Sequence, residues 1–192
     1  MRERQPAYHC APVPSFGDSA ARLLVVGLAP GMHGANRTGR PFTGDHAGLL
    51  LYRTLHHFGF SSAAESVGEG DGLALADCRI THAVRCLPPA NKPLPAEVRA
   101  CNGFLAWELR NLPVGGAVLA LGAVAHGAVL RALGLPAPAA GFAHGATHPL
   151  PGGRLLVDSY HCSRYNTQTR RLTPAMFAQA VATAREWLHR SA

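Results

Sequence analysis

The chain has 192 residues, of which 47% are hydrophobic and 15% charged, a composition that suits one compact domain and excludes extended disorder. Eighteen basic residues against eleven acidic ones leave a net charge of +7, which favours nucleic acid before an anionic membrane as a partner. The sequence contains no apolar run of the ~18 residues that a membrane span needs, and no secretory signal follows Met1. We therefore expect a cytoplasmic protein with no membrane contact, whose five cysteines are thiols or metal ligands rather than disulfides.

The first half of the chain reads as an arm, a strand, a long loop and a helix. Residues 1–20 lack periodicity and contain several prolines, which predicts an irregular N-terminal arm. The apolar run 23–26 predicts the first strand, and the loop 27–45 follows it. Helical spacing then predicts a helix that Gly59 ends. The face of this helix expected to be buried consists of Leu49, Leu50, Tyr52, Leu55 and Phe58.

Strands and helices continue to alternate in the second half. A strand at 76–84 and a Pro-rich turn at 87–93 precede a helix that begins at Pro95. The expected order beyond it is a strand at Ala117–Leu121, a helix to about Leu133, a linker at 135–145, a hairpin-type turn at 148–153, a strand at 154–160, a loop at 161–171 and a helix from Thr173. This alternation predicts one domain over residues 1–192, a three-layer α/β/α sandwich with a mainly parallel central sheet.

Two polar loops follow strands of this sheet, at 27–45 and 161–171. The carboxyl ends of parallel strands share one edge, where open α/β sheets bind ligands, and the first loop is far longer than the usual 2–6 residues. The sequence lacks the glycine-rich nucleotide patterns, a paired C-x-x-C, H-E-x-x-H and G-x-S-x-G. The carboxylate, histidine, aromatic and amide groups that remain can orient a water around a flat polar ligand.

Residues 27–45, GLAPGMHGANRTGRPFTGD, resemble the first motif of the uracil-DNA glycosylase superfamily, most closely that of its family 5. Residues 84–93, VRCLPPANKP, and residues 159–163, SYHCS, agree with two further motifs in the same order along the chain. The resemblance implies a monomeric base-excision-repair enzyme that hydrolyses the N-glycosidic bond of uracil and other deaminated or damaged bases in DNA. Such an enzyme must flip the base out of the duplex and into a pocket.

The resemblance also implies roles for individual residues. Asp45 would activate the water and His161 would stabilise charge on the departing base, since Leu28 and Ala29 stand where families 1 and 4 carry an acidic residue. Phe42 would stack on the flipped base and Asn91 would contact it. The substrate-binding set comprises Gly27, Leu28, Ala29, His33, Asn36, Phe42 and Asn91. Alternatively, Asp45 is a helix N-cap, His161 and Asn91 are structural, and Phe42 belongs to the core.

Residues of both loops are candidates for holding the DNA. The set comprises Arg37, Arg40, Ser163, Arg164, Tyr165, Asn166, Thr167, Arg170 and Arg171. Arg164 or Tyr165 could be a wedge inserted into the base stack, although a plain solvated loop is an equal alternative. The chain departs from the family at Cys162, where a proline is usual, and at Arg170, where a glycine is usual. The missing proline could shift His161.

The family carries a [4Fe-4S] cluster held by an N-terminal pair of cysteines and two later ones. Cys86 and Cys101 match the later two, whereas only Cys10 stands in the arm, so the ligand set is incomplete. Either the chain is shortened or its cluster is degraded or lost, while Cys78 and Cys162 are expected to be buried thiols. Two other functions stay open: a non-catalytic DNA-damage-binding homologue with a degraded site, and an unrelated small-molecule hydrolase.

Overall fold

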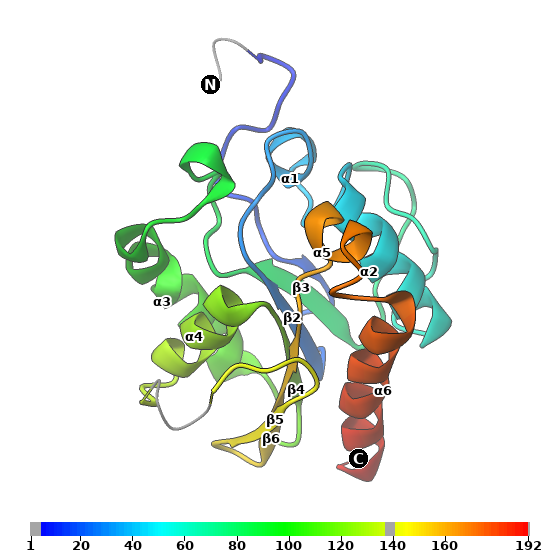
Figure 1. The fold of residues 1–192 in the computed structure, drawn as a ribbon, viewed down its shortest axis with the longest axis vertical. Coiled ribbons are helices and arrows are strands. Elements are labelled where there is room, and N and C mark those ends of the chain that lie inside the picture. Colours follow the sequence, from blue (N-terminus) through cyan, green and yellow to red (C-terminus); the bar gives the residue numbers. More distant parts are fainter. Residues whose placement is uncertain (1–4, 137–140, 192) are drawn as a thin grey trace.

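A mostly parallel sheet with helices on both faces forms the centre of the computed structural model, which describes residues 5–136 and 141–191 (Figure 1). The strands are β1 (Phe16–Gly17), β2 (Leu23–Gly27), β3 (Cys78–His82), β4 (Ala117–Leu121), β5 (Thr147–Leu150) and β6 (Arg154–Ser159). They are arranged in the order β1-β3-β2-β4-β6-β5. The four inner strands are parallel, and the edge strands β1 and β5 are antiparallel to their neighbours. The predicted α/β/α class with a mainly parallel sheet is confirmed.

Helices pack on the two faces of the sheet in two groups (Figure 1). They are α1 (Ala35–Thr38), α2 (His46–His57), the 3₁₀ turn η1 (Pro89–Asn91), α3 (Pro95–Asn111), α4 (Ala123–Ala132), α5 (Arg164–Gln168) and α6 (Pro174–Arg190). Helices α2 and α6 share one core cluster, and α3 and α4 share the other. None of these helices, within the ranges just given, is both long and apolar enough to cross a membrane.

The inner strands are apolar on both sides because both sides are covered. In β2, Leu23 and Val25 pack in the cluster under α2 and α6. Leu24 and Val26 pack in the cluster under α3 and α4. Such continuous apolar runs are typical of buried parallel strands. Because β2, β4 and β6 run parallel, the carboxyl ends of β2 and β6 lie at one edge of the sheet, where the two polar loops begin.

The N-terminal arm is more ordered than the sequence predicts. Residues 16–17 pair with β3, and the Val13 N–H donates to the carbonyl of Arg85 over 2.8 Å. Glu108 of α3, with a side chain 3% exposed, forms ion pairs with Arg79 and Arg85, and the hydroxyl of Ser15 donates to it. These long-range contacts order an arm that lacks any local periodicity.

Three further local predictions need correction. The loop predicted at 161–171 contains helix α5, and the turn predicted at 148–153 begins as strand β5, with the turn itself at 151–153. On α2, Tyr52 and Leu55 are fully buried as predicted, but Leu49 is 46% exposed and Leu51 is buried in its place. Three consecutive leucines at 49–51 fit two helical faces equally well, and the packing of α2 against the sheet selects one. Residues 137–140 of the predicted linker lie outside the described residues.

Candidate active site

A cleft of about 400 Å³ opens at the carboxyl edge of the sheet. Its walls come from the turn after β2, the first turn of α2, the Pro-rich turn and the loop after β6. The lining residues are Leu28, Ala29, Pro30, Gly31, Asp45, His46, Ala47, Asn91, His161, Ser163 and Arg164. The structure thus brings both residues predicted to be catalytic to one cleft, together with Leu28, Ala29 and Asn91 from the predicted substrate-binding set.

Asp45 is at once the N-cap of α2 and part of the cleft wall. Its Oδ1 accepts the N–H of Gly48 over 3.2 Å. Burial raises the pKa of Asp45, although hydrogen bonds from the amides of Gly48 and Ala47 and the charge of His46 act in the opposite direction. The carboxylate packs tightly against the preceding loop, since a Cβ on Gly34 would lie 2.3 Å from Oδ2.

His161, Phe42 and His82 form a stack of rings beside the cleft. The Phe42 ring lies 5.9 Å from that of His161 and 5.3 Å from that of His82, measured between centroids. Burial lowers the pKa of His161 to about 4. The pKa of His82 falls to about 3 through burial first and then the charges of His161 and Arg85. Both imidazoles are therefore neutral at pH 7, and His161 can act as a neutral hydrogen-bond donor.

Phe42 is held in a strained conformation. Its ring is 3% exposed and its φ is +54°, a left-handed value rare for a bulky side chain. A Cβ on Gly27 would lie 2.5 Å from the ring, and one on Gly48 would lie 1.8 Å from the Phe42 carbonyl oxygen. Both glycines are therefore needed for this packing. Phe42 belongs to the core and is not among the residues that line the cleft, so its stacking on a base stays a prediction.

Two residues predicted to bind substrate point toward the arm instead. Nδ1 of His33 forms a hydrogen bond with the hydroxyl of Tyr8 over 2.9 Å. The Asn36 side chain is buried and donates to the carbonyl of Met32 and the sulfur of Cys10. Neither His33 nor Asn36 lines the cleft. Substrate binding by these two residues stays a prediction.

The loop after β6 is held by helix α5. The Ser163 hydroxyl caps this helix by accepting the N–H of Asn166. Nδ2 of Asn166 donates to the His161 carbonyl over 2.8 Å, and Oγ1 of Thr167 forms a 2.9 Å hydrogen bond with Nε2 of His46. Cys162 is fully buried in the core. These contacts fix the backbone at His161 where the family's proline is missing.

The charged and aromatic members of the predicted DNA-binding set are scattered. Arg164 lines the cleft and Tyr165 is 70% exposed. Nε of Arg37 donates to the His33 carbonyl, and the Arg171 guanidinium lies 4.6 Å from the centre of the Tyr160 ring. Arg170, with a φ of +57°, lines a separate cavity of about 480 Å³ that shares His46 with the cleft. Contacts of Arg37, Arg170 and Arg171 with DNA stay predictions.

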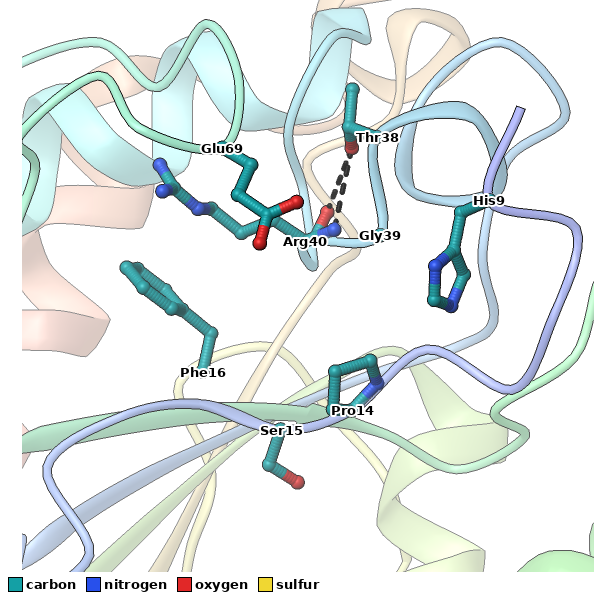
Figure 2. A pocket seen from close by; sticks show the side chains of 8 residues that line it. All are labelled: His9, Pro14, Ser15, Phe16, Thr38, Gly39, Arg40 and Glu69. Atoms are coloured by element: carbon teal, nitrogen blue, oxygen red, sulfur yellow. Dashed lines mark hydrogen bonds between the residues drawn. The ribbon is translucent and has the colours of Figure 1, made fainter. Parts of the chain in front are cut away.

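Arg40 lies at another cavity, of about 270 Å³, between the arm and the first loop (Figure 2). Its side chain is 10% exposed and forms a 2.7 Å ion pair with Asp71, and its guanidinium lies 4.5 Å from the centre of the Phe16 ring. Burial alone would raise the pKa of Asp71, but Arg40 and the amides of Leu73, Val67 and Gly68 outweigh it and lower the pKa. The ion pair engages Arg40, and DNA contact by this residue stays a prediction.

Two residues at the site were missed by the sequence reasoning. His46 lines the cleft directly after Asp45, and its place in the first turn of a helix was the available signal. His82 is the last residue of β3, opposite Gly27, and its ring stacks on that of Phe42. Its Nδ1 has no hydrogen-bond partner within the described ranges, and its position at the carboxyl end of a buried strand could have identified it.

The cysteines do not supply the ligands of a four-iron cluster. Burial, followed by electrostatic interaction with Cys101 and Glu97, raises the pKa of Cys86. Cys78 and Cys162 are fully buried in the core, as predicted, and the sulfur of Cys10 accepts a hydrogen bond from Nδ2 of Asn36. A [4Fe-4S] cluster takes four protein ligands, and the chain offers one pair, with Cys10 as the remaining candidate. The donor set does not fit the cluster.

Comparison with known proteins agrees with this geometry. The family model described as Uracil DNA glycosylase superfamily matches residues 14–185. A type-5 uracil-DNA glycosylase of Thermus thermophilus is 53% identical over 95% of this chain and 83% of its own length. Enzymes of the same name from Mycobacterium leprae and Pyrobaculum aerophilum are 46% and 43% identical, over 88% and 93% of this chain and 75% and 77% of their own lengths. The chain therefore belongs to the uracil-DNA glycosylase superfamily.

Proposed function

We propose that the protein is a DNA-repair glycosylase that hydrolyses the N-glycosidic bond of uracil in DNA and leaves an abasic site. The observation that carries this proposal is the convergence of Asp45 and His161 on one cleft at the carboxyl edge of the sheet. The names of relatives 43–53% identical over most of the chain support it. Other deaminated or damaged bases complete the proposed substrate range.

Asp45 is the proposed base for the water. A flipped uracil enters the cleft, because the bond to be broken is unreachable inside the duplex. The bond from C1′ to the base nitrogen breaks, its electron pair stays with the base, and the sugar takes oxocarbenium character as in sugar hydrolysis. Water adds to C1′ and gives its proton to the Asp45 carboxylate. Ionised Asp45 also stabilises the positive charge on the sugar.

His161 is the proposed partner of the departing base. Its pKa of about 4 keeps the imidazole neutral at pH 7. A neutral ring can donate one N–H to the carbonyl oxygen on which negative charge develops, and donors fixed in position beforehand stabilise such charge strongly because they need no reorganisation. Asn166 holds the backbone of His161 through its carbonyl and is the proposed positioning residue.

Helix α5 and the basic surface are the proposed holders of DNA. Ser163 and Arg164 stand at the cleft and suit contacts with phosphates on either side of the flipped nucleotide. The exposed Tyr165 is the proposed wedge that fills the gap in the base stack. We propose that the enzyme acts as a monomer in the cytoplasm, where its DNA substrate lies.

Excision is measured with oligonucleotides that contain one uracil, as U:G, U:A and single strands, followed by alkali. We expect strand scission at the uracil and none in matched oligonucleotides with thymine. Absence of abasic product from all three substrates contradicts the proposal. If the protein then still retards the uracil duplex more than the thymine duplex, it is the non-catalytic binder considered above.

The proposed reaction uses no step at an iron–sulfur cluster. The free thiols of Cys86 and Cys101, which match the later pair of the family motif, would supply half of the four ligands that such a cluster takes. We expect protein purified without oxygen to contain well under four iron atoms per chain and to lack the visible absorbance of a cluster. Iron analysis and an absorbance spectrum measure both quantities.

A further inference from the structure

Three potential metal ligands meet at the edge of the sheet that lies away from β1. Nδ1 of His126, on α4, lies 2.9 Å from Oδ1 of Asp158, on β6. Nε2 of His148, on β5, lies 3.1 Å from Oδ2 of the same carboxylate. The three side chains are 6%, 15% and 0% exposed, and one ligand atom from each lies within 4.8 Å of the other two. None of them lines the cleft that holds Asp45 and His161.

The position of Asp158 makes this arrangement unusual. Side chains alternate along a strand, so Asp158 shares a face with Leu156, which packs in the apolar cluster under α3 and α4. A carboxylate in such surroundings needs compensation by charge or hydrogen bonds. The two imidazoles are the partners within reach, and they come from two other elements.

The ligand types and their spacing fit a small divalent cation. Two imidazole nitrogens and one carboxylate oxygen are ligands that Zn²⁺ commonly takes, at about 2.0–2.2 Å. Ligands at those distances around a tetrahedral ion lie roughly 3.3 Å from one another. His126 Nδ1 lies 2.9 Å from Oδ1 of Asp158 and His148 Nε2 lies 3.1 Å from Oδ2, so the two nitrogens flank the two oxygens of one carboxylate. One ligand atom from each residue lies within 4.8 Å of the other two. An ion between the carboxylate and the two imidazoles would replace both hydrogen bonds once the side chains rotate to bring their ligand atoms closer together.

We propose that His126, His148 and Asp158 form a Zn²⁺ site, with a water as the fourth ligand. The partial exposure of His148 gives this water access from the surface. The ion would link α4 to the hairpin of β5 and β6, and β6 leads into the loop that carries His161. Its function is structural, because the site lies apart from the cleft. This inference does not depend on the proposed glycosylase activity.

Zn²⁺ binding to the full chain, stripped with a chelator, tests the site. Because cysteine thiolates are strong zinc ligands and Cys86 and Cys101 are free thiols that are not buried, the titration uses a Cys86→Ser/Cys101→Ser background. Calorimetry is expected to give one Zn²⁺ per chain in this background. His148→Gln should weaken binding at least about 10-fold, as loss of a ligand costs no less than loss of its outer partners. His57→Gln, an exposed histidine on α2, should leave the affinity unchanged.

Thermal unfolding gives a second readout. An ion that binds only the folded state raises its melting temperature, so Zn²⁺ should raise the melting temperature of the background but not that of His148→Gln. The glutamine amide can still donate to Asp158, and circular dichroism checks that this variant folds. Co²⁺ should give the visible spectrum of a tetrahedral nitrogen–oxygen site without thiolate charge transfer. No zinc binding in the background, or equal zinc binding after His148→Gln, overturns the proposal. The three side chains are then held together by hydrogen bonds alone.

Discussion

At the scale of single residues, Asp45 caps a helix and lines the cleft, so its position is compatible with both roles that the sequence presents as alternatives. One carboxylate oxygen caps α2 through the N–H of Gly48, while the residue also lines the cleft. The cap fixes the side chain and partly offsets the cost of burying it, and the remaining desolvation raises its pKa. A capping aspartate at the mouth of a cleft is therefore already oriented to accept a proton.

Asp45→Asn separates these two roles. Asparagine caps helices as well as aspartate does but cannot accept a proton from water, so we expect kcat to fall about 10²–10⁴-fold with nearly unchanged DNA binding and melting temperature. Single-turnover excision and filter binding measure the two quantities. Asp18→Asn, at an exposed aspartate, is the matched control. Unchanged kcat would assign activation of the water to another group.

The pH dependence of the wild type follows from the same residue. In the proposed reaction Asp45 must be ionised to accept a proton, and its pKa is raised in the folded protein. As pH falls, protonation should therefore remove activity at a pH above the ordinary carboxyl pKa of 3.8. A rate profile on an acid-stable duplex measures this acid limb, and the limb should be absent from the residual activity of Asp45→Asn.

Gly34→Ala tests how closely the first loop packs against Asp45. The new methyl group would lie 2.3 Å from Oδ2, so the carboxylate must move, and we expect kcat to fall about 10²-fold, as small displacements of a positioned group do. Gly103→Ala is the control. Nothing lies within 4 Å of the added Cβ there, and its helical position should gain about 0.5–1 kcal/mol of stability. Equal kcat in both variants would show that the loop around Gly34 makes room for the methyl group without displacing the Asp45 carboxylate.

At the scale of elements, α5 turns a loop into a rigid support for His161. Five helical residues begin at the Ser163 cap, and Asn166 reaches back to the His161 carbonyl. This arrangement presents Tyr165 to solvent with 70% of its surface exposed. A large exposed aromatic on a short fixed helix beside the cleft is suited to enter a base stack.

Tyr165→Ala is expected to affect duplex substrates selectively. Filling the gap left by a flipped base matters only where a stack exists, so excision from U:A duplexes should fall about tenfold while excision from single strands stays within twofold. Parallel kcat/KM measurements on the two substrates test this expectation. An equal loss on both substrates would instead indicate that Tyr165 supports the fold of α5.

At the scale of the whole molecule, the net charge of +7 is partly committed to the fold. Arg79 and Arg85 neutralise the buried Glu108, and Arg40 neutralises Asp71. The arginines that are free to meet phosphates are therefore fewer than the composition indicates. Arg164 is one that combines surface exposure with a place at the cleft.

The salt dependence of DNA binding measures this count. Each phosphate neutralised contributes about 0.9 to the slope of log K against log salt. We expect Arg164→Ala to reduce the magnitude of the slope by about one and to weaken binding to uracil and thymine duplexes alike. Arg110→Ala, exposed on α3, should leave the slope unchanged. A slope that stays constant in Arg164→Ala would remove this residue from the phosphate contacts.

Prediction from sequence succeeded where the physical signal is local or periodic. The buried strands at 23–26 and 117–121, the helix from Pro95 and the helix capped by Thr173 all follow from apolar runs, proline positions and capping residues. Prediction was wrong or incomplete for Leu49, α5 and β1, because each depends on packing against a distant element. Burial of Leu51 in place of Leu49 is decided by the sheet beneath α2.

The sequence by itself determined the α/β/α class and the edge of the sheet where the two polar loops meet, because the carboxyl ends of parallel strands lie at one edge. The motif resemblance, and not the strand pattern, singled out Asp45 and His161, and the structure places both at one cleft. Only the tertiary structure decided which other side chains reach the cleft. In the folded protein, Phe42 stacks on His82 and on His161. Arg40 forms an ion pair with Asp71. His126, His148 and Asp158 come together from three different elements. Such neighbours are far apart along the chain, and the packing of the whole domain sets their distances.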